Sequence, residues 1–403
     1  MIPLFEKSNR LEKAVNKNFK RFLYHSINWN GRLIEISGSR GVGKTTLMLQ
    51  KLSEYNEKNT GAALYISADD PWFFTNSLID TAEEFEKLGG HYLFIDEVHK
   101  YPSKHKNYDW SAEIKHMYDS LPELNIVYSG SSILKLYKGH GDLSRRKIAH
   151  KLPGLSFREY LEINNIYVSD VIHLDDLFKS HETIAADLVS RLKILPHFRD
   201  YLHHGYFPFY NEAPQAYFNR LDDVISVVLE TDIPAVSDIP FETSIKLKKL
   251  LALIAQSSPF TPNLSKLGQT LYISDQRTLL KYINYLHKAE LINVLGIESK
   301  GNQLLRKPDK IYLNNTNLMY CFSSRVNEGT QRETFFLNQL QNIHVVTTSS
   351  RGDFVADNVV FEVGGKNKSK SQIAGLPNAF LVLDDIEYGS YQSIPLWLFG
   401  FLY

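Results

Sequence analysis

The chain has 403 residues, which is too many for one hydrophobic core, so two to three domains are expected. Its 45 basic residues balance 45 acidic ones, so the net charge does not favour binding to nucleic acid or membrane. A charged partner must therefore bind to a local patch of opposite charge. A single cysteine, Cys321, excludes an internal disulfide, and no apolar run approaches the roughly 20 residues of a membrane span. We therefore expect a cytoplasmic chain with no membrane partner, signal peptide or structural metal.

Short β-prone runs alternate with helical patterns from about residue 19 to residue 157. This alternation is typical of an α/β fold in which helices cover a parallel sheet. The expected strands are Leu33–Ser37, Ala63–Ser67, Tyr92–Ile95 and Asn125–Ser129.

Residues 38–46 read Gly-Ser-Arg-Gly-Val-Gly-Lys-Thr-Thr and fit GxxxxGK[ST], the P-loop motif, between an expected strand and an expected helix. The backbone N–H groups of such a loop and the start of its helix attract phosphates. Lys44 is expected to reach the β- and γ-phosphates of ATP, and the Thr45 hydroxyl to ligate Mg²⁺. The candidate ATP-binding residues are Gly38, Ser39, Arg40, Gly41, Val42, Gly43, Lys44, Thr45 and Thr46.

The apolar strand Tyr92–Ile95 leads directly into Asp96 and Glu97. A buried parallel strand is apolar throughout, so its first carboxylates mark the ligand end of the sheet. Asp96 is expected to hold Mg²⁺ through water, and Glu97 to act as the general base of hydrolysis. The alternative is that Asp96 only caps the next helix.

Two further features are candidates for catalysis. Ser129 ends the fourth expected strand, where a polar side chain could sense the γ-phosphate, although small polar residues also serve in turns and caps. Arg145 and Arg146 are candidates for an arginine finger, although exposed arginines more often belong to a solvated surface. A finger that acts between subunits would require an oligomer.

Residues 243–310 concentrate positive charge, with 9 Lys and 2 Arg against 2 Asp and 2 Glu. Three helical patterns and then two β-prone runs, Leu291–Leu295 and Lys310–Leu313, follow the order of a winged helix-turn-helix. On the expected recognition helix, Ser274–Leu291, four residues share one face that fits a DNA groove. The alternatives are a protein-docking module and a solvated basic face. These four residues are Arg277, Lys281, Asn284 and Lys288.

The last segment has the pattern of a small α/β domain with four residues in the order of a metal-dependent nuclease. In such enzymes carboxylates hold magnesium, and a lysine two residues after the last acid orients water. Here that position is Gly364, and the next lysine lies one strand repeat further on, so we expect an inactive remnant. The four residues are Glu333, Asp353, Glu362 and Lys366.

These motifs together resemble the prokaryotic AAA+ ATPases that carry a C-terminal domain of unknown function. The resemblance extends from the P-loop through residues 92–97 and 129–132 to Leu152–Tyr160, Gly205–Pro208 and Phe361–Lys366. It implies an AAA+ core, a winged helix and a C-terminal fold similar to restriction endonucleases, but no particular substrate.

We therefore expect an α/β P-loop fold with four segments. The leading hypothesis is ATP binding and hydrolysis with Mg²⁺, coupled to a C-terminal half that binds DNA or a protein. The alternatives are a slow nucleotide-dependent switch and an ATP-gated metal-dependent nuclease. The expected segments are 1–160 for the AAA+-like core, 161–242 for a helical lid or connector, 243–325 for the winged helix and 326–403 for the nuclease-like domain.

Overall fold

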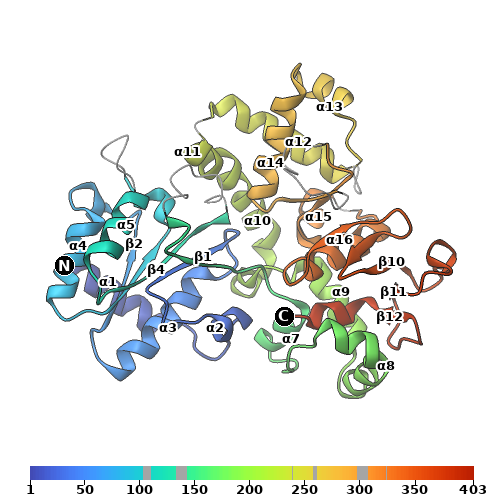
Figure 1. The fold of residues 1–403 in the computed structure, drawn as a ribbon, viewed down its shortest axis with the longest axis horizontal. Coiled ribbons are helices and arrows are strands. Elements are labelled where there is room, and N and C mark those ends of the chain that lie inside the picture. The colour runs from blue at the N-terminus through green and yellow to red at the C-terminus, as the bar shows by residue number, and fades with distance from the viewer. Residues whose placement is uncertain (103–109, 133–142, 238, 257–260, 297–306, 324) are drawn as a thin grey trace. The chain divides into compact units, whose positions relative to one another are not determined.

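The computed structural model describes residues 1–102, 110–132, 143–237, 239–256, 261–296, 307–323 and 325–403 (Figure 1). The chain forms two compact units. The first, here called the P-loop unit, comprises residues 1–153 and 230–240, and the second, the C-terminal unit, comprises residues 154–229 and 241–403. Residues 230–240, expected in the connector, thus belong to the unit that holds the P-loop. Within the described ranges, no helix has the length and apolar character needed to cross a membrane.

The P-loop unit is built on a five-stranded sheet in which all neighbouring strands are parallel, in the order β2-β3-β4-β1-β5. The parallel sheet expected from the sequence is confirmed, and β4 lies between the strand that precedes the P-loop and the strand that ends at Asp96. The fifth strand was not expected, because its four residues are partly exposed and show no apolar run. The strands are β1 (Leu33–Gly38), β2 (Ala63–Ser67), β3 (Tyr92–Asp96), β4 (Asn125–Ser131) and β5 (Ile148–Lys151).

Helices cover this sheet and complete its core (Figure 1). Leucine and isoleucine side chains of the four longer strands are fully buried against residues of α1, α4 and α5. Helix α3 starts at the P-loop lysine and packs against β1, β2, β3 and β4. The helices of the P-loop unit are α1 (Ile2–Ala14), α2 (Phe22–Ser26), α3 (Lys44–Lys58), α4 (Leu78–Lys87), α5 (Trp110–Ser120) and α11 (Ile233–Ser237).

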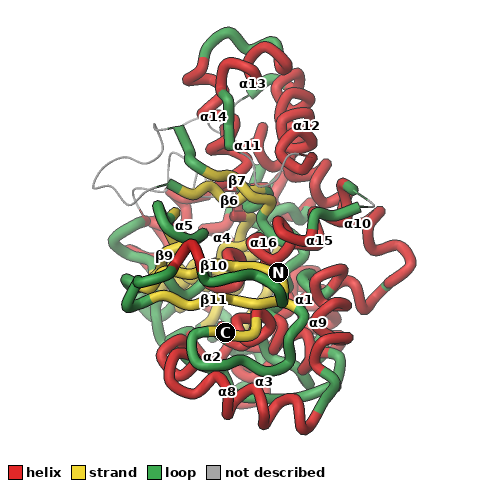
Figure 2. The backbone as a smooth tube through the Cα atoms, turned by 90° about the vertical axis from the view of Figure 1, so that its right-hand side faces the viewer, coloured by secondary structure: helices red, strands yellow, loops and turns green. Residues whose placement is uncertain are grey.

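The first part of the C-terminal unit is helical and ends in a two-stranded antiparallel hairpin, β6 with β7 (Figure 2). Helices α12, α13 and α14 pack against one another ahead of this hairpin, which is the element order that the basic segment predicts. The elements are α7 (Phe157–Ile163), α8 (Leu174–Arg191), α9 (Ile194–His204), α10 (Tyr217–Val227), α12 (Phe241–Gln256), α13 (Leu264–Leu271), α14 (Gln276–Lys288), β6 (Ile292–Leu295) and β7 (Lys310–Leu313).

The last part of the chain forms a mixed sheet in the order β12-β11-β10-β9-β8. Strands β10, β11 and β12 run parallel, and β8 and β9 are antiparallel to their neighbours. Strands β9 and β12, of three residues each, were not expected from the sequence. The elements are α15 (Thr316–Phe322), α16 (Glu328–Leu340), β8 (Val346–Thr348), β9 (Phe354–Ala356), β10 (Val359–Gly365), β11 (Ala379–Asp384) and β12 (Ser393–Pro395).

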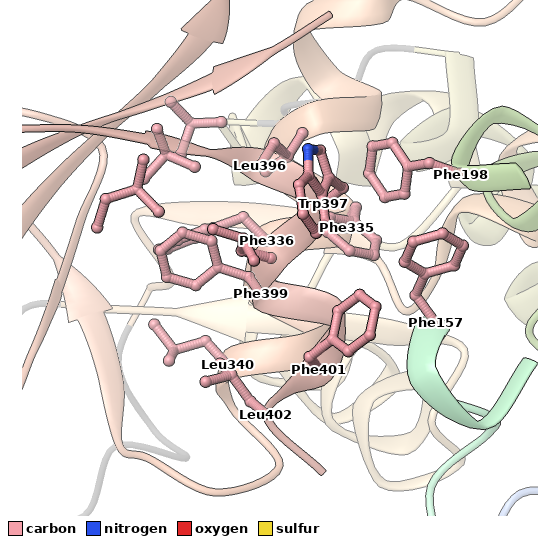
Figure 3. Close-up of a cluster of buried hydrophobic side chains, with 14 of the residues drawn as sticks. Phe157, Phe198, Phe335, Phe336, Leu340, Leu396, Trp397, Phe399, Phe401 and Leu402 are labelled. Carbon is pink, nitrogen blue, oxygen red and sulfur yellow. The ribbon is translucent and has the colours of Figure 1, made fainter. Parts of the chain in front are cut away.

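An aromatic cluster forms the core of the C-terminal unit (Figure 3). Helix α16 contributes Phe335, whose ring lies 4.8 Å from that of Phe198 on α9, centroid to centroid, in an edge-to-face arrangement. The neighbouring Phe336 contacts Phe399, which belongs to the short helix 396–401 near the end of the chain. Aromatic side chains dominate core energetics because each buries a large apolar area. This cluster therefore joins the two ends of the unit's sequence in one core.

Replacing Phe335 by alanine should lower the free energy of unfolding of the C-terminal unit by about 3–5 kcal/mol, because the change removes a fully buried ring and leaves a cavity. Urea denaturation followed by circular dichroism measures this loss. The exposed Tyr391 is the control, and its alanine variant should stay within about 0.5 kcal/mol of the wild type. Equal losses in the two variants would contradict the assignment of Phe335 to the core.

Candidate functional site

The turn between β1 and α3 has a backbone that requires glycine. Gly41 and Gly43 adopt φ angles of 86° and 97°, in the left-handed region that other residues avoid. At Gly38 a Cβ atom would lie 2.2 Å from the carbonyl oxygen of Leu152. The residues predicted for phosphate binding therefore form one tight loop at the carboxyl end of β1.

Lys44 is the first residue of α3, and its side chain folds back over the loop. Its ammonium donates hydrogen bonds to the carbonyl oxygens of Gly38 and Ser39, at 2.9 and 3.0 Å. The loop backbone thus holds the positive charge over the turn, beside the N-terminus of the helix. Both features favour an anion at this place.

Asp96 ends β3 and is the hub of the site, with only 2% of its surface exposed. One carboxylate oxygen accepts hydrogen bonds from the Thr45 hydroxyl at 2.5 Å and from the Tyr65 hydroxyl at 2.8 Å. The other accepts from the Ser129 hydroxyl and from the backbone N–H of Glu97. Burial, and then the charge of Asp96, raises the pKa of Tyr65 well above its usual range, so the phenol stays a donor. The two expected Mg²⁺ ligands, Thr45 and Asp96, are therefore in direct contact.

The structure gives Ser129 a different place from the one expected for a γ-phosphate sensor. Its side chain is fully buried and its hydroxyl is bound to Asp96, so it orients that carboxylate. Three residues further along the chain, the Ser132 hydroxyl is also buried, and no atom of the described residues forms a hydrogen bond with it. Ser132 is therefore the better candidate for contact with a bound ligand.

Glu97 follows Asp96 in a strained backbone conformation, with φ 54° and ψ 40°. Non-glycine residues seldom adopt this conformation, and such strain concentrates at functional sites. The carboxylate lies 2.9 Å from the Lys100 ammonium and 3.6 Å from the Arg40 guanidinium. Burial by itself would raise the pKa of Glu97, but Lys44 and other nearby positive groups outweigh burial and lower it. Glu97 is therefore ionised at neutral pH, as a general base must be.

Four residues of the site were not predicted from the sequence. Tyr65 on β2 holds Asp96, and Arg21 donates to the carbonyl oxygens of Val42 and Pro153, at 2.6 and 2.8 Å. The other two, His99 and Asp232, lie beside Glu97 and Arg40. Tyr65 could have been noticed as a polar group inside an otherwise apolar strand. Arg21, His99 and Asp232 belong to no sequence motif.

Arg145 and Arg146 lie just before β5, whose first residue, Ile148, pairs with Ile34 near the start of β1. Because these strands are parallel, the two arginines lie at the amino edge of the sheet, whereas the P-loop follows its carboxyl edge. Arg146 binds Asp119 through two hydrogen bonds, at 2.9 and 3.0 Å. The fold thus keeps both arginines away from the P-loop of their own chain. An arginine finger at either position would have to act at the nucleotide site of another subunit.

The candidate DNA-binding residues lie on α14, whose N-terminus is capped by Asp275. Arg277 and Lys281 are exposed, whereas Asn284 and Lys288 are partly buried. The leucine and isoleucine residues on the opposite face are buried, as the spacing predicts. The exposed basic part of the helix is therefore narrower than expected.

The candidate nuclease residues also lie in the C-terminal unit. Glu333, on α16, accepts a hydrogen bond of 2.6 Å from the Tyr312 hydroxyl. The Lys310 ammonium lies 3.8 Å from Glu333 and 3.5 Å from Asp353, so it joins the two acids. Burial, and then the charge of Asp353, raises the pKa of Glu333. In the described part of the chain, no three His, Cys, Asp or Glu residues are grouped closely enough to hold a metal ion by themselves.

The lysine that meets Glu362 is not the expected one. Lys366 is exposed beyond the end of β10, whereas the Lys368 ammonium lies 2.5 Å from the Glu362 carboxylate. The Lys368 side chain runs across Gly364, where a Cβ atom would lie 2.6 Å from its methylene carbons. Counting residues along the strand therefore selected Lys366. The chain turns after β10, and this turn brings Lys368 to Glu362 instead.

Comparisons with known proteins agree with the fold of the P-loop unit. Residues 30–161 match a family model described as "AAA domain", and residues 195–328 match one described as "Domain of unknown function (DUF8612)". No curated protein matches the sequence.

Similar solved structures include three ATPases or replication proteins. A Walker-type ATPase of Pyrococcus abyssi is 14% identical, with 79% of this chain and 94% of that chain covered and a TM-score of 0.38. The ORC1 protein of Aeropyrum pernix in complex with DNA is 11% identical, with 79% and 91% covered and a TM-score of 0.31. The AMPPCP-bound DnaA of Aquifex aeolicus is 16% identical, with 71% and 88% covered and a TM-score of 0.26.

The family match covers the sheet, the glycine-rich turn and the strand that ends at Asp96. Residues 30–161 are therefore similar in sequence to an AAA domain, and they form a parallel α/β sheet with the glycine-rich turn after its first strand.

Proposed function

We propose that the chain binds ATP with Mg²⁺ at Gly38–Thr46 and hydrolyses it. The observation that carries the proposal is the contact between the Thr45 hydroxyl and the Asp96 carboxylate, with the ionised Glu97 directly after it. A hydroxyl and a carboxylate brought together in this way, at the start of a helix, are oxygen ligands of the kind Mg²⁺ prefers. The AAA domain match supports nucleotide binding at the same residues.

In this proposal each side chain has a separate task. The Lys44 ammonium and the start of α3 bind the β- and γ-phosphates. Thr45 and Asp96 hold Mg²⁺, which when bound supplies positive charge against the phosphate oxygens. Glu97 takes a proton from the attacking water, and Ser132 offers its buried hydroxyl to the γ-phosphate.

The nucleotide cycle is proposed to control binding of DNA or a protein by the C-terminal unit. Its support is the element order α12, α13, α14 and hairpin β6–β7, which is that of a winged helix-turn-helix. Arg277 and Lys281 on α14 point to DNA, because they are exposed, basic and one helical turn apart.

A second candidate activity is metal-dependent cleavage of a phosphodiester by the C-terminal unit. Its support is Lys368, which takes the position beside Glu362 that the sequence left without a lysine. The other two acids, Glu333 and Asp353, are joined to each other by the Lys310 ammonium. The missing lysine was the reason to expect an inactive remnant, so this reason no longer holds.

Replacing Glu97 by glutamine should reduce ATP turnover by about 10²- to 10⁴-fold, because the base is lost while the phosphate-binding groups remain. Phosphate release measures turnover, and titration with a fluorescent nucleotide should show that binding is retained. The exposed Glu123 is the matched control, and its glutamine variant should keep full activity. No phosphate release by the wild type would refute hydrolysis, and release of one phosphate per bound nucleotide would favour the slow switch.

The Lys281→Ala variant should bind duplex DNA more weakly across all sequences, and the slope of log affinity against log salt should fall by about one unit. Fluorescence anisotropy at several salt concentrations measures both effects. The Lys193→Ala variant removes an exposed lysine from the turn between α8 and α9 and should leave both unchanged. Absent or salt-independent DNA binding would assign the helix to protein docking.

DNA incubated with the wild type and Mg²⁺ or Mn²⁺, with and without ATP, should be cleaved if the second candidate is correct. Lys368→Ala should then reduce cleavage at least about 10²-fold, because a positioned charged group of the reaction is lost. Lys366→Ala should leave cleavage intact, since that side chain is exposed. Gel electrophoresis follows the reaction. Intact DNA under all conditions would support the original expectation that the domain is an inactive nuclease remnant.

A further inference from the structure

The P-loop arginine has a buried partner from a distant part of the sequence. Arg40 donates hydrogen bonds to both carboxylate oxygens of Asp232, at 3.0 and 3.3 Å. Asp232 lies 192 residues further along the chain and is 1% exposed. It belongs to residues 230–240, which pack with the P-loop unit although the chain before and after them belongs to the C-terminal unit.

The same guanidinium also faces the proposed general base, since it lies 3.6 Å from the Glu97 carboxylate. It is therefore close to the position where the attacking water and the γ-phosphate would meet. A guanidinium is a planar group of five donors that matches phosphate oxygens well, and it keeps its charge when it is buried. The Arg40 guanidinium is thus a group suited to phosphate, but in this structure it is bound to the Asp232 carboxylate.

A neighbouring histidine makes an exchange of partners possible. The His99 side chain is 1% exposed, and its Nε2 atom lies 3.8 Å from Asp232 and 3.7 Å from Glu97. Its two ring nitrogens form no hydrogen bond in the described structure. A buried carboxylate that loses its only cation is costly, but Asp232 would keep His99 beside it if Arg40 turned away. The geometry thus supplies Asp232 with a second partner.

We propose that Asp232 is the resting counter-ion of Arg40, and that the nucleotide phosphates compete with Asp232 for the arginine. The inference rests on the proposed nucleotide site and adds a regulatory segment to it. When ATP binds, Arg40 exchanges Asp232 for phosphate oxygens, and residues 230–240 lose one of their attachments to the P-loop. Asp232 therefore acts on nucleotide affinity through Arg40, as a positioning residue.

The competition and a purely structural role of Asp232 predict opposite changes in nucleotide affinity when the charge of Asp232 is removed. Removing the charge of Asp232 frees Arg40 to bind the phosphates, so nucleotide should bind more tightly. An aspartate that merely stabilised the loop would, on removal, weaken binding. The effect should be larger for an ATP analogue than for ADP, because Arg40 faces Glu97 at the reacting end of the site.

The test is a double-mutant cycle on the full chain, read by titration with fluorescent ADP and with a fluorescent non-hydrolysable ATP analogue. Asp232→Asn should tighten binding of the ATP analogue by about fivefold or more, and Arg40→Ala should weaken it. In the Arg40→Ala background, Asp232→Asn should have no effect. The exposed Asp223 is the matched control, and its asparagine variant should bind like the wild type.

Unchanged or weaker binding by folded Asp232→Asn would overturn the inference, and so would tightening that persists without Arg40. A second measurement needs no variant. Adding the ATP analogue to the wild type should raise amide hydrogen exchange in residues 230–240, and unchanged or slower exchange there would also overturn the inference. A wild type that binds no nucleotide would instead refute the proposed function itself, so the two failures are distinguishable.

Discussion

The buried carboxylate of Asp96 is the interaction on which the site depends. A charge that is almost removed from water must be matched by donors, and here they come from α3, from both neighbouring strands and from the next peptide group. Two of these donors, Tyr65 and Ser129, come from β2 and β4, the strands on either side of β3. The Asp96 carboxylate also holds the N–H of Glu97, whose left-handed backbone turns its side chain towards the positive groups near the P-loop.

The parts of the fold that follow from local rules were predictable. Buried parallel strands are continuous apolar runs, so the ends of β2 were predicted without error and those of β1, β3 and β4 within two residues. The P-loop was recognisable because phosphate binding needs glycine and lysine at fixed spacing. Strands β5, β9 and β12 were missed, since they are short and contain no long apolar run to separate them from loops.

The remaining part of the site depends on contacts that no spacing encodes. Ser129 was expected to face the ligand, but the side chain turns to Asp96, because a buried carboxylate needs donors before the site binds anything. Lys366 was chosen by counting along a strand, whereas the route of Lys368 over Gly364 depends on the turn after β10. Asp232 gave no sequence signal, because its role arises only from its distant partner Arg40.

The discontinuous composition of the P-loop unit has a consequence for how the protein is made. During synthesis the sheet, the P-loop and both acidic residues emerge well before residues 230–240. Domains generally fold as the chain leaves the ribosome, so the parallel sheet can form while Arg40 still lacks its carboxylate partner. Until Asp232 arrives, Glu97 is the carboxylate beside that guanidinium. If the proposed competition exists, a nucleotide phosphate meets no opposition from Asp232 in the nascent chain.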